Sequence, residues 1–118
     1  MNVEIIALSN FQKEAKRLIK KYRSLKEELI FLESELRKNP FTGVEIQKNT
    51  YKIRLAVKSK GKGKSDGLRV LTHIDIEIKV DSSKATKVYL LSIHDKSEYE
   101  NISNSFLASL IKEASEEN

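Results

Sequence analysis

Residues 51–80, YKIRLAVKSKGKGKSDGLRVLTHIDIEIKV, decide the fold of this chain. Apolar and polar residues alternate over residues 51–58 and again, with few breaks, over residues 68–80, which is the period of a half-buried β-strand. Residues 59–67, between them, contain three glycines and no apolar residue, so they are expected to form a flexible loop. The stretch therefore predicts two antiparallel strands joined by a basic loop.

The sequence on either side of this hairpin predicts helices and two more strands. Residues 9–22 and 24–36 carry apolar residues at helical spacing, and Asn39-Pro40 ends the second helix. Residues 3–8 predict a short strand, residues 88–94 a strand covered on both faces, and residues from 103 onward a last helix. Residues 41–50 are expected to be a loop. The result is a single α+β domain over residues 1–118, a small antiparallel-rich four-stranded sheet with an N-terminal helical hairpin and a C-terminal helix.

The composition excludes several classes of protein. The chain has no cysteine, which rules out disulfides and thiolate metal sites and suits a reducing cytosol. Its first ten residues lack the basic segment and long apolar run of a secretion signal. No stretch reaches the roughly 18 apolar residues that a membrane-spanning helix needs. We therefore expect a cytoplasmic protein with no membrane partner.

Positive charge is concentrated in residues 51–69, which hold seven Lys or Arg residues and one acid, whereas the whole chain has a net charge of +5. A lysine-glycine loop is often only a solvated segment. Here, however, Lys52, Arg54 and Arg69 fall on strands, where a rigid sheet holds cations close together. The mutual repulsion of these cations is offset when a phosphodiester binds, so the pattern indicates a nucleic-acid partner.

The two histidines, His73 and His94, show no spacing typical of a metal site, and we expect no metal and no cofactor. An ordinary, partly buried role is common for a histidine on a strand. His94, at the end of the last predicted strand, is also placed for proton transfer, because the pKa of histidine lies near working pH.

The strand-loop-strand YKIRLAVKSKGKGKSDGLRVLT, followed by VYLLSIHDKSE and a short helix, resembles the RelE/ParE superfamily of bacterial type II toxins. The HigB-like branch is the most similar, with its K-I-R strand, lysine-glycine loop and Y-L-L-T-I-Y-x-K-x-E ending. The resemblance covers roughly residues 22–111. It implies a RelE-like fold and an endoribonuclease that cuts messenger RNA in the ribosomal A site without metal.

The resemblance also implies site residues. The catalytic positions of the family fall on Lys52, Arg54, Arg69 and Lys96, with His94 in place of the tyrosine of the HigB-like ending. RNA binding is expected from Lys58, Lys60, Lys62, Lys64, His73 and Tyr99. Repulsion from neighbouring cations favours the neutral amine of Lys52, which suits a general base, while His94 or Lys96 is expected to protonate the leaving oxygen.

The sequence is also compatible with two other functions. A ParE-like protein shares the fold but inhibits DNA gyrase without catalysis, and it generally lacks the basic set found here. A plain RNA-binding module would use the loop only to hold phosphates. For the toxin, the expected partners are the ribosome, mRNA and a cognate antitoxin that forms a hetero-oligomer with it.

Overall fold

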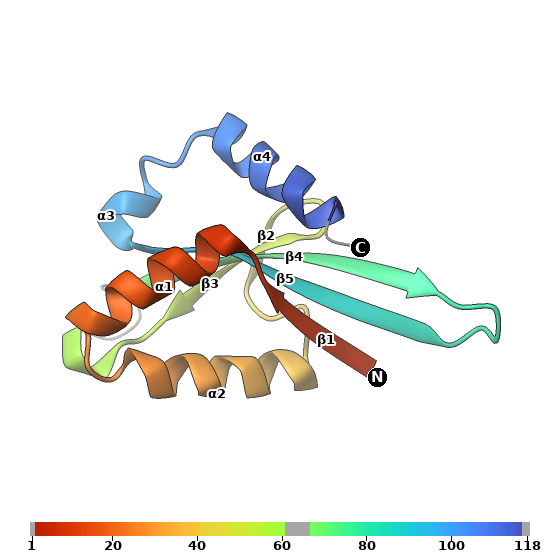
Figure 1. The fold of residues 1–118 in the computed structure, drawn as a ribbon, viewed down its shortest axis with the longest axis horizontal. Coiled ribbons are helices and arrows are strands. Elements are labelled where there is room, and N and C mark those ends of the chain that lie inside the picture. Colours follow the sequence, from red (N-terminus) through yellow and green to blue (C-terminus); the bar gives the residue numbers. More distant parts are fainter. Residues whose placement is uncertain (1, 61–66, 117–118) are drawn as a thin grey trace.

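The computed structural model describes residues 2–60 and 67–116, and these residues form an α+β fold around one sheet (Figure 1). The strands are β1 (Asn2–Ala7), β2 (Val44–Gln47), β3 (Thr50–Leu55), β4 (Leu68–Ile78) and β5 (Lys84–Asp95). The helices are α1 (Ser9–Lys21), α2 (Leu25–Lys38), α3 (Lys96–Tyr99) and α4 (Asn104–Ser115), with a 3-10 turn, η1 (Lys58–Lys60). The sheet order is β1-β5-β4-β3-β2, with β1 parallel to β5 and every other pair antiparallel.

The fold class predicted from the sequence is confirmed, but the described sheet has five strands rather than four. The additional strand, β2, lies in the expected loop 41–50. All four of its side chains are exposed, so it shows no burial pattern, and only pairing with β3 makes it a strand. Gly43 precedes it with φ 104°, and a Cβ there would lie 2.5 Å from the carbonyl oxygen of Lys52. A glycine is therefore required where this edge begins.

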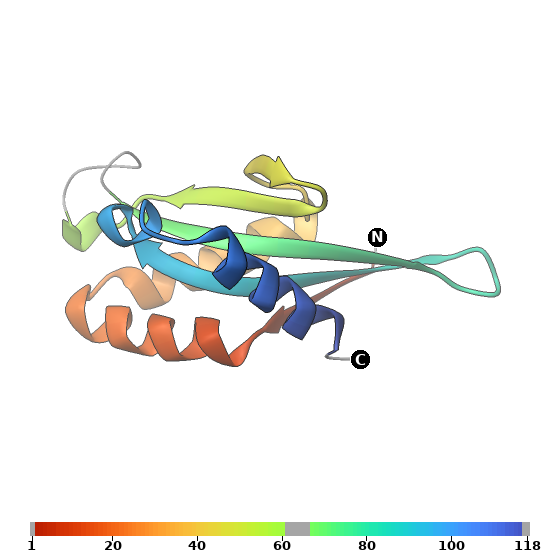
Figure 2. The same cartoon turned by 90° about the horizontal axis from the view of Figure 1, so that it is seen from above.

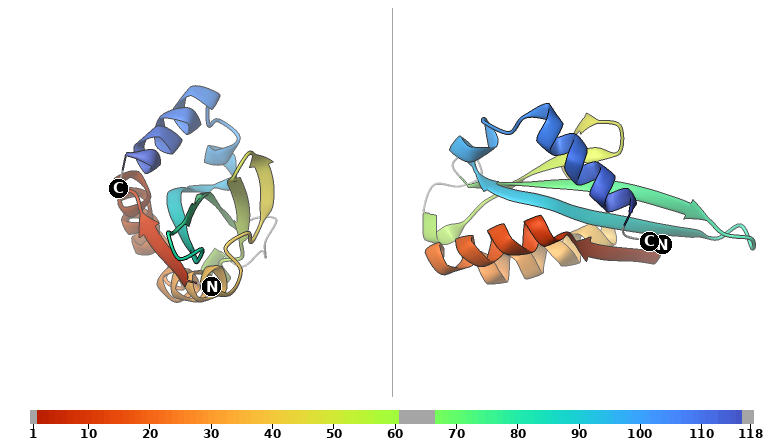
Figure 3. Two further views of the ribbon diagram at one scale, coloured as in Figure 1. Left: turned by 90° about the vertical axis from the view of Figure 1, so that its right-hand side faces the viewer. Right: turned by 45° about the horizontal axis from the view of Figure 1, so that its top comes forward.

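Helices cover both faces of the sheet (Figure 3). One face packs against α1 and α2 and holds the larger core, which includes Leu18, Leu25, Leu36, Val70 and Ile93. The other face packs against α4 through a smaller core that includes Leu71, Tyr89, Leu91, Leu107 and Leu110. The strand predicted to be covered on both faces, β5, is indeed central and contributes to both cores. Among the described helices, none combines the length and apolarity that a membrane span requires.

A β-bulge in β5 changes which side chains face α4. The register between β4 and β5 shifts at Leu91, which is an extra residue on β5. Before the bulge, Leu90 packs on the α1–α2 side, and after it Ile93 does, so the alternation has slipped by one position. His94 consequently projects on the same face as Arg69, its partner on β4. Bulges commonly re-aim a side chain in this way.

The β4–β5 hairpin extends beyond the rest of the sheet (Figure 2). β3 begins at Thr50, opposite His73, and β1 begins at Asn2, opposite Ala85, so the tip of the hairpin has no strand on either side in the described residues. The apolar alternation of β4 continues along this arm. Its last isoleucine, Ile78, is therefore exposed rather than part of the core.

Candidate functional site

Three side chains form a row across the sheet on the α4 face, and we call Arg54, Arg69 and His94 the basic row. Arg54 of β3 is directly opposite Arg69 of β4, which is directly opposite His94 of β5. Side chains that are opposite one another on one face have Cβ atoms about 5 Å apart. The structure thus brings together three of the five residues expected to be catalytic.

Lys52 and Tyr99 lie beside this row. Lys52 is two residues before Arg54 and so shares its face of β3. Its Nζ lies 5.1 Å from the centre of the Tyr99 ring, a cation–π contact of about 0.5–1 kcal/mol. Tyr99 ends α3, so this short helix places an aromatic ring next to the amine. Such a ring is suited to stacking on a nucleobase.

The basic row runs from solvent into the protein. Arg54 is exposed, whereas Arg69 is 4% exposed and His94 is 8% exposed. Of the two arginines, Arg54 projects into solvent, whereas Arg69 is covered by neighbouring side chains. An anionic ligand that approaches from solvent would therefore meet Arg54 first, and contact with His94 requires the side chains that cover it to move.

His94 has a nearly buried ring with a nitrogen that is unpaired within the described residues. Its Nε2 has no hydrogen-bond partner among residues 2–60 and 67–116. Burial lowers the pKa of His94 from the ordinary value of 6.5, the carboxylates of Glu14 and Glu98 oppose this shift, and the charge of Arg17 adds to it. The imidazole is therefore uncharged at neutral pH and able to take up a proton.

The short helix α3 is held in place by a capping box and by α1. Glu98 Oε1 accepts a hydrogen bond from the backbone N of Asp95 at 3.0 Å, and the Asp95 side chain caps the helix in return. Arg17 of α1 donates to Glu98 Oε2 at 3.1 Å. Burial would raise the pKa of Glu98, but the hydrogen bond from Asp95 and the charge of Arg17 lower it overall. These contacts fix the helix that carries Tyr99.

Lys60 and Lys96 lie apart from the basic row, around a cavity of about 430 Å³ at the end of β5. Lys60 Nζ is ion-paired with Asp95 at 3.3 Å, and the hydroxyl of Tyr22 donates to the same carboxylate at 3.1 Å. Lys96 is exposed on the rim of this cavity. The two lysines bring positive charge to this cavity, but Asp95 and Glu100 also line it and Asp95 is paired with Lys60.

The remaining predicted RNA-binding residues are dispersed. His73 lies on the same face as the basic row but farther along β4. Its Nδ1 is 2.9 Å from Thr50 Oγ1, and burial lowers its pKa, with Asp75 opposing. Lys58 is exposed in η1, where its backbone N donates to Glu28 Oε2 at 2.8 Å. Lys62 and Lys64 lie outside the described residues.

One residue of this face is not evident from sequence motifs. Ser92 lies on the α4 face one row from His94, is fully buried, and its Oγ has no hydrogen-bond partner within the described parts of the chain. A serine inside an otherwise apolar strand is the signal that could have identified it. No group of three potential metal ligands is present among the described residues.

Comparison with known proteins bears on the fold. No family model matches the chain, and no curated protein sequence matches it. One similar solved structure is that of the E. coli toxin RelE, a mutant with two arginines replaced by alanine, in the free state. The match has a TM-score of 0.56 and 16% sequence identity, and it covers 96% of this chain and 98% of that chain. The chain described here therefore has a RelE-like fold.

Proposed function

We propose that this chain is the toxin of a type II toxin–antitoxin system and cleaves messenger RNA on the ribosome without a metal ion. The observation that carries the proposal is the basic row on a RelE-like fold, with Arg54, Arg69 and His94 in register and Lys52 beside them. Assignment to the HigB-like branch rests on the sequence resemblance and forms part of the same proposal.

The chemistry follows from the positions of these groups. In metal-independent cleavage, the ribose 2′-OH loses its proton and attacks the adjacent phosphate, and the 5′ oxygen leaves as it gains a proton. The transition state carries extra negative charge, which Arg54 and Arg69 would stabilise from preorganised positions. The guanidinium group suits this role because it stays charged and presents a rigid fork of donors to phosphate oxygens.

We assign the role of base to His94 rather than to Lys52, and this assignment requires the side chains that cover the Nε2 of His94 to move when RNA binds. An uncharged imidazole with an unpaired nitrogen can accept the 2′-OH proton, and burial keeps it uncharged at neutral pH. Lys52, partly exposed against Tyr99, is then the acid for the leaving oxygen, or Lys96 is. This exchanges the roles that the sequence resemblance suggests for Lys52 and His94.

The expected setting follows from this activity. A ribonuclease that acts on its own cell's messages needs the cytoplasm as its site of action and a cognate antitoxin to restrain it. We propose a toxin–antitoxin hetero-oligomer, in which an acidic, partly disordered antitoxin segment folds over the basic row.

Primer extension on messages from cells expressing the chain tests the proposal. Cuts that require translation and follow codon boundaries are expected, and Arg54→Ala should reduce them by a factor of about 10²–10³. Arg37→Ala is the matched control, because Arg37 is an exposed arginine on α2, away from the basic row. Gyrase-dependent DNA breaks without RNA cuts would indicate the ParE-like alternative. RNA retention without cuts would indicate a plain RNA-binding module.

A further inference from the structure

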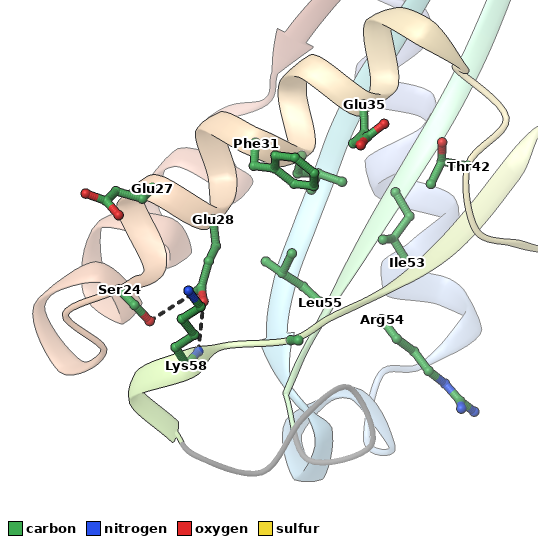
Figure 4. A pocket seen from close by; sticks show the side chains of 12 residues that line it. Ser24, Glu27, Glu28, Phe31, Glu35, Thr42, Ile53, Arg54, Leu55 and Lys58 are labelled. Carbon is green, nitrogen blue, oxygen red and sulfur yellow. Dashed lines mark hydrogen bonds between the residues drawn. The ribbon is translucent and has the colours of Figure 1, made fainter.

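A groove lies between α2 and β3, on the opposite face of β3 from the basic row (Figure 4). Its volume is about 580 Å³. Ile53 and Leu55 of β3 line it, together with Leu32 of α2, and all three are buried core residues. Phe31 also lines it yet is 64% exposed, because it lies outside the stripe of leucines that α2 buries. A large aromatic side chain that is this exposed beside a groove indicates a surface that a partner can cover.

The α2 side of the groove is acidic, whereas Arg54 and Lys58 line it from the side of β3, where the Arg54 side chain points away from α2 (Figure 4). Glu27, Phe31 and Glu35 occur at intervals of four residues, so they form one stripe along α2, and all three line the groove. Glu27 and Glu35 make no ion pair with any residue in 2–60 or 67–116. Glu28 is different, because its carboxylate accepts hydrogen bonds from the Lys58 backbone N and from the Ser24 hydroxyl.

This charge pattern selects the class of ligand. The chain has a net charge of +5, so two unpaired carboxylates beside an apolar groove give this surface a local charge opposite to that of the whole chain. They repel phosphates, which makes the groove unsuitable for a second segment of RNA. They attract cations that are presented next to apolar side chains. A helix with an apolar stripe flanked by lysine or arginine offers both.

We propose that the groove binds a basic amphipathic helix of a partner protein, whose apolar stripe covers Phe31 and whose cations pair with Glu27 and Glu35. The two glutamates are eight residues apart on α2, about 12 Å at 1.5 Å per residue. A helix lying along α2 would therefore carry its cations seven or eight residues apart. The proposal goes beyond RNA cleavage and does not depend on it. The partner it describes is basic, and therefore differs from the acidic antitoxin segment that suits the basic row.

A pair of designed peptides tests the proposal. Each is an alanine-based helix of about 18 residues with leucines at positions i, i+3, i+4 and i+7. One peptide has lysines flanking the stripe seven residues apart, and the other has glutamates at the same positions. Fluorescence anisotropy with the full chain measures binding. The lysine peptide is expected to bind at least tenfold more tightly than the glutamate peptide.

Charge reversal on the protein completes the test. The double variant Glu27→Lys/Glu35→Lys is expected to weaken the lysine peptide at least tenfold and to strengthen the glutamate peptide. The matched control is Glu113→Lys/Glu116→Lys at the C-terminal end of α4, where Glu116 is the capping residue; it changes the net charge equally but lies outside the groove. Circular dichroism confirms that both variants are folded. Phe31→Ala is expected to weaken both peptides.

Three outcomes would overturn the proposal. The first is the absence of lysine-peptide binding. The second is equal weakening by the groove variant and the α4 control, which would show that only net charge matters. The third is a dimer, seen by sedimentation, that Glu27→Lys/Glu35→Lys dissociates, because the occupant of the groove would then be a second copy of this chain.

Discussion

The two faces of β3 present opposite surfaces. On one face, Lys52 and Arg54 join Arg69 and His94 in a cationic site that suits an RNA phosphate. On the other face, Ile53 and Leu55 line an apolar groove whose α2 side is acidic. Strand alternation alone separates the two, because successive residues project to opposite sides of a sheet. One strand therefore presents a cationic surface on one side and contributes to an apolar groove with an acidic α2 wall on the other.

If the two faces act independently, the largest effect is expected from a substitution on the cationic face, measured as the rate of RNA cleavage. Arg54→Ala should lower the rate of RNA cleavage by about 10²–10³, the usual cost of losing one transition-state contact. It should leave the lysine peptide bound in the groove as before. Single-turnover cleavage and anisotropy measure the two properties. A rate within a few-fold of the wild type, with Arg37→Ala as reference, would remove Arg54 from the site.

The pH dependence of the cleavage rate tests the buried end of the basic row, where His94 lies. Burial lowers the pKa of His94, so its neutral form predominates above about pH 6.5 and is lost as pH falls through the lowered pKa. Below that pKa the cleavage rate should fall about tenfold per pH unit. The free energy of unfolding should fall at higher pH than the rate does, between the ordinary value of 6.5 and the lowered pKa of folded His94, because over that range the unfolded state binds the proton more readily.

The variant His94→Gln should remove this pH dependence of the rate. His73→Gln is the control, because burial also lowers the pKa of His73 but this residue lies outside the basic row. If His73→Gln removed the pH dependence of the rate and His94→Gln did not, the proton acceptor would be His73, and our assignment to His94 would be wrong.

A conservative change on the groove face should have a smaller effect. Ile53→Val removes one methylene group from a buried position and should lower the free energy of unfolding by about 1 kcal/mol. Binding of the lysine peptide should weaken slightly, and cleavage should stay constant. Ile78→Val is the matched control, since Ile78 is exposed on the β4–β5 arm. Equal losses for the two variants, measured by urea denaturation, would mean that Ile53 is not a structural part of the groove.

The smallest expected effect on stability is at Phe31. Because this side chain is largely exposed, Phe31→Ala should change the free energy of unfolding by less than about 0.5 kcal/mol. Its buried neighbour Leu32 provides the contrast, and Leu32→Ala should cost about 2–5 kcal/mol. If Phe31→Ala destabilised the chain as much as Leu32→Ala, Phe31 would be part of the core. The proposal that a partner covers this groove would then lose its main support.

Most of the sheet could be predicted from residue patterns, because long alternating or apolar segments bury the same side chains in almost any arrangement. β3, β4 and β5 fall where their patterns indicate, and so do the two helices of the hairpin. β2 could not be predicted, since all its side chains are exposed and only pairing with β3 defines it. The single-domain organisation and the roles of individual site residues stay predictions.

The sequence by itself determined the fold class and the grouping of Lys52 with Arg54, because spacing of two along a strand is a local property of the backbone. Only the tertiary structure decided that His94 joins them. Uninterrupted alternation along β5 would have turned His94 toward α1 and α2, and the bulge at Leu91 turns it toward Arg69. The burial of Arg69 and the exposure of Phe31 were likewise decided by packing. Both depend on which distant elements cover a given face, and that is a property of the assembled sheet and helices rather than of the local sequence.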